Sequence, residues 1–142
     1  MNWTAQQGKA PVETPGSRPP CVLVVDDDRA TRLSAEITLR LAGYKVVTAD
    51  NTKLGLQLAA DHSPDVVILD LQLATSDNLY VLQAVRALLF HKDIAVLATS
   101  NSWEKIFDLR WGHGRFGSER FDGWMLKPVV ADVLLKEVAC RL

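Results

Sequence analysis

The chain has 142 residues, with 16 basic and 17 acidic side chains and a formal net charge of -1. This length fits one domain with a core of its own, and the balanced charge gives no electrostatic reason to expect nucleic acid or an acidic membrane surface as a partner. Because the sequence has neither a signal-peptide pattern nor an apolar run of roughly 20 residues, we expect a cytoplasmic protein that does not bind a membrane.

The amino-terminal stretch, residues 1–20, is polar and rich in proline, so it can bury little apolar area. We expect a disordered tail here and one folded domain over residues 21–142. From Cys21 onward, short apolar runs alternate with patterns of helical period. The runs predict strands over residues 21–25, 45–49, 66–69 and 94–98, and the helical patterns predict helices over residues 29–42, 52–62 and 79–90.

Alternating strands and helices pair in parallel through right-handed crossovers, with helices on both faces of the sheet. We therefore predict a doubly wound α/β fold. In the first helix Ala30, Leu33, Ile37 and Leu41 share one face, and Gly43 supplies the expected stop. The last helix carries a similar stripe of Val130, Leu134, Val138 and Leu142. We expect both stripes to face the core.

Polar side chains follow the apolar runs. Asp26 and Asp27 follow the first strand, Asp70 the third and Thr99 the fourth, while Lys127 closes a later apolar run. In doubly wound sheets, ligands bind at the carboxyl ends of the strands, where the strand order reverses. Carboxylates gathered there must raise a pKa or share a cation, and hard oxygen ligands suit Mg²⁺. The alternative is that each aspartate is merely a solvated strand end.

Lys127 and Thr99 would add a positive charge and a hydroxyl donor, the groups that a phosphoryl oxygen seeks beside a metal. Asp70 would then be the nucleophile, and the product would be an acyl phosphate. A phosphatase of the haloacid dehalogenase kind also places an aspartate after a buried strand. That family needs a second aspartate two residues later, where this chain has Gln72.

Four segments carry a resemblance to a known family: LVVDDD at 23–28, VVILD at 66–70, ATS at 98–100 and WMLKP at 124–128. In order and spacing they resemble the response regulator receiver domain of two-component signalling, of the single-domain chemotaxis-regulator type. The resemblance implies a five-stranded parallel sheet of flavodoxin-like order 2-1-3-4-5. It also implies that Asp26 and Asp27 bind Mg²⁺, that Asp70 accepts the phosphoryl group, and that the backbone carbonyl of Gln72 completes the protein ligands.

By the same resemblance, Thr99 would sense the phosphoryl group, Lys127 would pair with it, and Trp124 would occupy the aromatic switch position. The bond between Lys127 and Pro128 would be cis. An ungapped count from Asp70 instead places Ser100 at the hydroxyl position. We favour Thr99, because Ala98 then ends the buried strand, and Ser100 remains the alternative.

The sequence departs from the family pattern in two regions. Ala74 and Asn78 stand where proline and glycine are common, and residues 102–124 are longer than the usual fourth helix and its connection. We expect a short helix that ends near Trp111. Three aromatic residues of this region would form a binding patch if exposed, or would instead cap the sheet: Trp103, Trp111 and Phe116.

The leading hypothesis is a phosphoacceptor in a two-component phosphorelay rather than a metabolic enzyme. A sensor histidine kinase or a phosphotransfer protein would donate to Asp70, and residues 102–142 would contact a downstream protein or form a homodimer. Nucleic acid is not expected as a partner, since no recognition-helix motif is present. The rival hypothesis is a pseudo-receiver that serves as a phosphorylation-independent interaction module.

Overall fold

The structure is a computed structural model that describes residues 18–74, 87–88, 91, 93–110 and 121–142. Its strands form one parallel sheet in the order β2-β1-β3-β4-β5. They are β1 (Cys21–Val25), β2 (Lys45–Ala49), β3 (Val66–Asp70), β4 (Ala95–Ser100) and β5 (Gly123–Leu126). The helices are α2 (Arg29–Leu41), α3 (Thr52–His62), α4 (Leu71–Ala74), α6 (Trp103–Arg110) and α7 (Ala131–Ala139).

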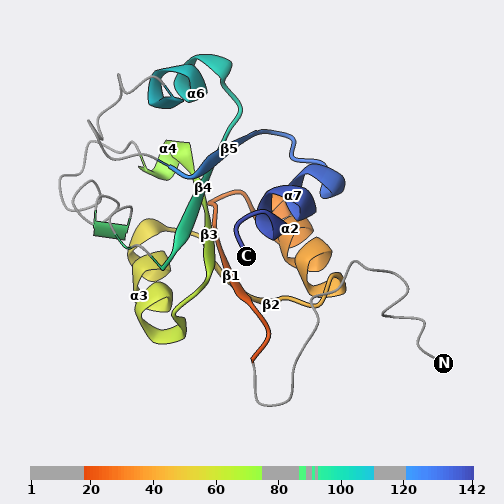
Figure 1. Cartoon of the computed structure of the whole chain (residues 1–142). Coiled ribbons are helices and arrows are strands. Elements are labelled where there is room, and N and C mark those ends of the chain that lie inside the picture. The colour runs from red at the N-terminus through yellow and green to blue at the C-terminus, as the bar shows by residue number, and fades with distance from the viewer. Residues whose placement is uncertain (1–17, 75–86, 89–90, 92, 111–120) are drawn as a thin grey trace.

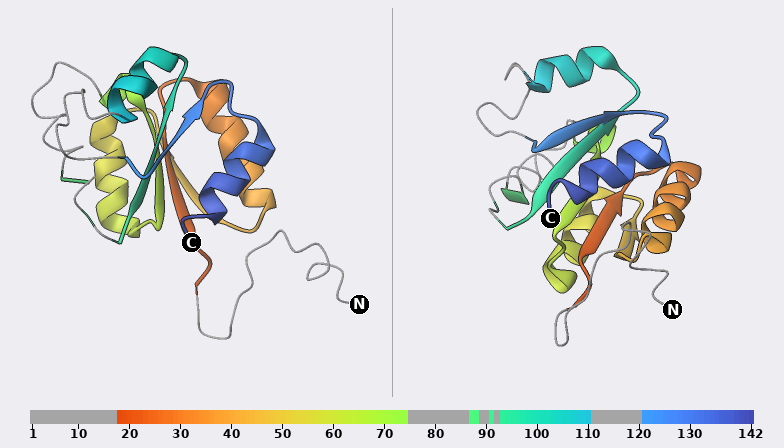
Figure 2. Two further views of the ribbon diagram at one scale, coloured as in Figure 1. Left: turned by 45° about the horizontal axis from the view of Figure 1, so that its top comes forward. Right: turned by 45° about the vertical axis from the view of Figure 1, so that its right-hand side comes forward.

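Helices cover both faces of this sheet. Figures 1 and 2 show α2 and α7 on one face and α3 on the other. The predicted doubly wound fold and its strand order 2-1-3-4-5 are thus confirmed. Since successive side chains of a strand point to opposite faces, β1 sends Leu23 and Val25 into the core under α3, and Val22 and Val24 into the core under α2 and α7.

Two aspartates fix the strand register at the amino-terminal edge of the sheet. Asp26 and Asp70 lie at the opposite edge. Asp65, just before β3, donates its N–H to the Cys21 carbonyl at 2.8 Å and accepts the Cys21 N–H at 2.8 Å. Asp122, just before β5, does the same with Val96, at 2.8 Å and 2.7 Å. Each side chain thereby replaces one backbone acceptor of the ladder and ties the start of its strand to a neighbour.

The prediction for the apolar stripe of α2 is wrong. Leu33, Ile37 and Leu41 are 47%, 50% and 84% exposed, and Ala30 is exposed as well, whereas Leu39 is completely buried. The helix therefore turns a different face to the sheet.

Two arginines explain this orientation of α2. The Arg32 guanidinium donates to the carbonyl of Asp26 at 2.8 Å, and the Arg40 guanidinium donates to the carbonyl of Val46 at 2.9 Å. The first carbonyl lies directly after β1 and the second lies within the edge strand β2, so both bonds tie α2 to the sheet in the orientation that buries Leu39 and exposes the stripe. The stripe of α7 was predicted better, because Leu134 and Val138 are buried. Only the residues at its two ends, Val130 and Leu142, are exposed.

Other expectations meet the limits of the described chain. Residues 1–17, most of the helix expected over residues 79–90, and Asn78 lie outside the described residues. The short helix expected after residue 102 is α6, and Trp111 lies beyond the part described. Helix α4, which follows β3 directly, was not predicted.

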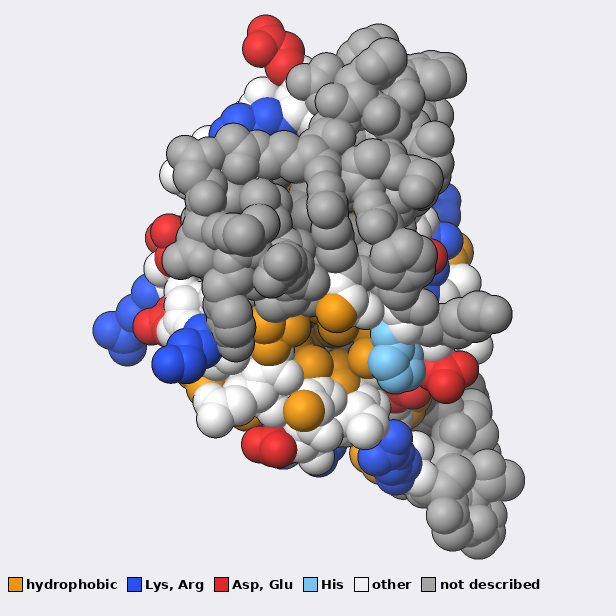
Figure 3. All heavy atoms as spheres, turned by 90° about the vertical axis from the view of Figure 1, so that its left-hand side faces the viewer, with side chains coloured by type: hydrophobic (Ala, Val, Ile, Leu, Met, Phe, Trp, Pro, Cys, Tyr) orange, Lys and Arg blue, Asp and Glu red, His pale blue; other side chains and the backbone are white. Residues whose placement is uncertain are grey.

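The α3 side of the molecule has a hollow. Figure 3 looks onto this side, where hydrophobic side chains gather. A pocket there is lined by Leu56, Ala59, Leu88, His91 and Ile94, among others.

Among the helices that the structure describes, none combines the length and the apolar character that a membrane crossing requires.

The orientation of α2 can be tested by two truncations on one helix. Leu39→Ala should lower the free energy of unfolding by about 2–5 kcal/mol, because it empties a packed site. Ile37→Ala should change it by less than about 0.5 kcal/mol, as is usual for an exposed position. Urea unfolding followed by circular dichroism measures both values. Equal losses in the two variants would contradict this orientation of the helix.

Candidate functional site

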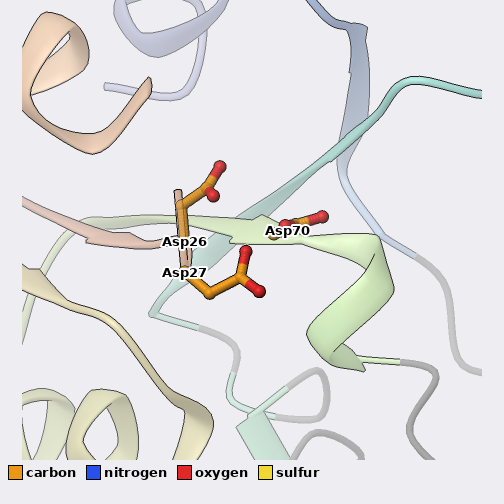
Figure 4. A group of neighbouring side chains, drawn as sticks. All are labelled: Asp26, Asp27 and Asp70. Atoms are coloured by element: carbon orange, nitrogen blue, oxygen red, sulfur yellow. The ribbon is translucent and has the colours of Figure 1, made fainter. Parts of the chain in front are cut away.

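Three aspartates meet at the carboxyl edge of the central strands. Val25 of β1 pairs with Leu69 of β3, so that Asp26 and Asp70, the next residues, lie side by side. Asp27 follows in the loop to α2, and Figure 4 shows the three side chains at this edge. One oxygen from each of the three carboxylates lies within 4.8 Å of the other two. The predicted convergence of these residues is therefore present in the structure.

Lys127 supplies the positive charge of this cluster. Its Nζ lies 2.8 Å from Oδ2 of Asp26 and 3.3 Å from Oδ2 of Asp70. The residue follows β5, and its N–H donates to the Ser100 carbonyl at 2.7 Å. The Lys127–Pro128 peptide bond is cis, as the family resemblance implies. The ammonium group thus bridges two buried carboxylates.

Backbone N–H groups orient the same two carboxylates. Oδ1 of Asp26 accepts the Asp28 N–H at 2.9 Å, and Oδ1 of Asp70 accepts the Gln72 N–H at 3.0 Å. In each case the donor lies two residues further along the chain, the geometry of an Asx turn. Each carboxylate therefore has one oxygen on the backbone and one on Lys127. The proposed role of the Gln72 carbonyl as a metal ligand stays a prediction.

Asp28, the third acid of the run, has a different task. It is the N-cap of α2, and its carboxylate accepts the Thr31 N–H at 3.0 Å and the Thr31 hydroxyl. These hydrogen bonds lower the pKa of the Asp28 carboxyl. The sequence signal for this cap is an aspartate directly before the helical pattern, three residues ahead of the Thr31 N–H that it accepts.

Burial and charge perturb the two groups that face each other across the site. Burial raises the pKa of the Asp70 carboxyl; the Gln72 N–H and the Lys127 charge oppose this, and the Asp26 charge adds to it. Burial by itself would lower the pKa of the Lys127 ammonium. The hydrogen bond to Asp26 and the charges of Asp70 and Asp26 outweigh burial, so that its pKa is raised. Lys127 therefore stays protonated beside the cluster.

The two candidate hydroxyls differ in their surroundings. Thr99 is the direct ladder partner of Asp70, so both side chains lie on one face of the sheet. Its Oγ1 is buried and has no hydrogen-bond partner among the residues that the structure describes. Ser100 lies one residue further, and its hydroxyl accepts the Ser102 N–H at 3.0 Å. The geometry therefore favours Thr99 as the hydroxyl that faces Asp70.

The aromatic candidates divide between the core and the surface. Trp124 is partly buried and packs against the core under α3. Trp103, at the start of α6, is 68% exposed, so it does not cap the sheet. The other two candidates, Trp111 and Phe116, lie outside the described residues.

The donor set fits the predicted metal. Asp26, Asp27 and Asp70 offer carboxylate oxygens, which are the ligands that Mg²⁺ prefers. Asp27 is exposed, so water can complete the coordination. The Thr99 hydroxyl, which has no hydrogen-bond partner among the described residues, lies on the same face of the sheet as Asp70.

Comparison with known families agrees with this site. The sequence profile of the response regulator receiver domain matches residues 22–139. The chain belongs to this family. Receiver domains belong to the response regulators of two-component signalling, so residues 22–139 form a signalling domain.

Curated relatives of this receiver domain are longer proteins. Transcriptional regulatory protein PrrA of Mycobacterium bovis is 32% identical over 128 residues, which are 89% of this chain and 52% of that protein. Transcriptional regulatory protein KdpE of Mycobacterium tuberculosis is 36% identical over 114 residues, 80% of this chain and 47% of the relative. The receiver thus spans about half the length of these relatives.

Solved structures show the same fold. Chemotaxis response regulator CheY4 of Vibrio cholerae aligns with a TM-score of 0.70 at 25% identity, over 88% of this chain and 100% of that one. A response regulator from Thermotoga maritima aligns with a TM-score of 0.70 at 23% identity, over 87% and 98% of the two chains.

The raised pKa of Asp70 predicts how stability depends on pH. The folded state holds this proton more tightly than the unfolded chain, so this carboxyl lowers stability as the pH rises from about 3.8 through the raised value. Asp70→Asn should therefore increase the free energy of unfolding at pH 7, because it removes the cost of ionising this buried carboxyl. The gain should shrink toward pH 4.

The measurement is urea unfolding between pH 4 and pH 7 in the presence of EDTA. Exposed Asp61→Asn is the matched control and should show no comparable gain. A gain for Asp70→Asn that is the same at both ends of this pH range would contradict the assignment to Asp70.

Proposed function

We propose that this receiver is a working phosphoacceptor of a phosphorelay, and that Asp70 takes a phosphoryl group from a sensor histidine kinase or a phosphotransfer protein. One observation carries the proposal: the Asp70 carboxylate lies among two further carboxylates, the Lys127 ammonium and the Thr99 hydroxyl, all at one edge of the sheet. An aspartate that only ends a strand and has no function would not need these carboxylate, ammonium and hydroxyl groups around it.

The chemistry follows from these groups. An Asp70 oxygen attacks phosphorus, the bond between phosphorus and the donor atom breaks, and the bonding electrons leave with the donor. Bound Mg²⁺, held by Asp26, Asp27 and Asp70, would neutralise negative charge on the transferred group. Lys127 lies 3.3 Å from Asp70 and can turn toward the phosphoryl oxygens once Asp70 is phosphorylated. The protein itself aligns the donor and balances charge.

Thr99 links the new phosphoryl group to a change of conformation. Its hydroxyl has no partner among the described residues and lies beside Asp70, so a phosphoryl oxygen would give it one. A hydrogen bond formed in one state only biases a two-state equilibrium toward that state. Trp124 pairs with Ala98, the neighbour of Thr99, and would move with this strand end.

The proposed output surface comprises residues 102–142. It would contact a downstream protein or a second copy of the chain. The exposed Trp103 supports a contact there, since exposed aromatic residues anchor interfaces. The expectation that nucleic acid is not a partner gains no support from the comparisons. The relatives are transcriptional regulatory proteins, and this chain matches about half of each.

Intact mass measurement after incubation with acetyl phosphate and Mg²⁺ tests the acceptor. The unmodified chain should gain one phosphoryl adduct, Asp70→Asn should gain none, and EDTA should prevent the adduct. Asp61→Asn, which changes an exposed aspartate, should label like the unmodified chain. If nothing labels under conditions that modify a control receiver, the pseudo-receiver hypothesis replaces this one.

A further inference from the structure

Arg32 makes two hydrogen bonds that span the acidic loop. Its guanidinium Nη1 donates to the carbonyl of Asp26 at 2.8 Å. Its backbone N–H donates to the carbonyl of Asp28 at 3.0 Å. The two accepting carbonyls flank Asp27, so one residue of α2 holds the backbone on both sides of this aspartate.

Asp27 is the one acid of the cluster that depends on this backbone. Asp26 and Asp70 are each held by a backbone N–H and by Lys127. The Asp27 carboxylate is exposed and has neither a hydrogen bond nor an ion pair with any described residue. Its direction is therefore set by the peptide that joins Asp26 to Asp27, and the carbonyl of that peptide is the one bound by Arg32.

We propose that Arg32 is a positioning residue that directs Asp27 toward the cation site. The proposal rests on the proposed function, since it gives Arg32 a role in binding Mg²⁺. The guanidinium is suited to this task because it is always charged and its planar fork makes a directional bond. A lysine at the same place would keep the charge without that geometry.

A purely electrostatic role for Arg32 would have the opposite sign. A fixed positive charge beside three carboxylates repels a divalent cation. Removing only that repulsion would tighten the binding of Mg²⁺. If Arg32 instead holds Asp27 in place, its removal weakens binding, so the direction of the change separates the two roles.

The same helix supplies a matched control. Arg40, two turns later in α2, donates to the carbonyl of Val46 at 2.9 Å. Like the Arg32 bond, it joins a guanidinium of α2 to a backbone carbonyl, but this carbonyl belongs to β2 and lies away from the aspartates. Arg40 also pairs with Glu36 at 3.0 Å. Arg40→Met should therefore reproduce any general loosening of α2 without disturbing Asp27.

The experiment is isothermal titration of the full chain with Mg²⁺ alone. Arg32→Met should raise the Kd for Mg²⁺ about tenfold, the size expected for loss of a group that orients a metal ligand. Arg32→Lys should also weaken binding, because it keeps the charge and loses the fork. Arg40→Met should leave the Kd unchanged. Circular dichroism of each variant verifies that it is folded, and Arg32→Lys serves if Arg32→Met is not.

A double-mutant cycle tests whether Arg32 acts through Asp27. In the Asp27→Asn background, Arg32→Met should have no further effect on the Kd. An unchanged or lower Kd in Arg32→Met, or an equal rise in Arg40→Met, would overturn the positioning role. Failure of the unmodified chain to bind Mg²⁺ would instead contradict the proposed function, so the two failures are distinguishable.

Discussion

The parallel register of β1, β3 and β4 is the constraint on which the site depends. It places Asp26 beside Asp70 and Asp70 beside Thr99, and no side chain can leave this edge without a shift of a whole strand. The register is fixed at the other edge by Asp65 and Asp122, whose carboxylates complete the ladder. Asp65 and Asp122 at one edge thus fix the strands whose register brings Asp26 and Asp70 together at the other edge.

Such a cluster is stable only if its repulsion is balanced. Lys127 and two backbone N–H groups provide this balance for Asp26 and Asp70, and burial strengthens each of these interactions. Under the proposed function, a divalent cation would compete with Lys127 for the oxygens of Asp26 and Asp70. Binding of that cation, and later of a phosphoryl group, would redistribute the contacts of one ammonium group among partners that are already in place.

The sequence predicts the strands and the position of the polar residues that follow them well, because both are local signals. Short β-branched runs mark buried strands, and the polar residue after each run necessarily lies at the carboxyl edge. The orientation of α2 was predicted wrongly because it is not a local property. Leu33, Ile37 and Leu41 form a regular stripe, but Arg32 and Arg40 bind carbonyls of the sheet, and no periodicity reports such bonds. The tasks of Asp28, Asp65 and Asp122 likewise depend on their partners in space.

The orientation of α2 also connects its outer face with the chemistry. The helix begins at the cap Asp28, holds the Asp26 carbonyl through Arg32 and exposes the stripe of Leu33, Ile37 and Leu41. The exposed stripe and the acidic loop therefore belong to one rigid element. A displacement of α2 that moves the stripe also moves the Arg32 guanidinium and the Asp26 carbonyl that it binds, directly before Asp27.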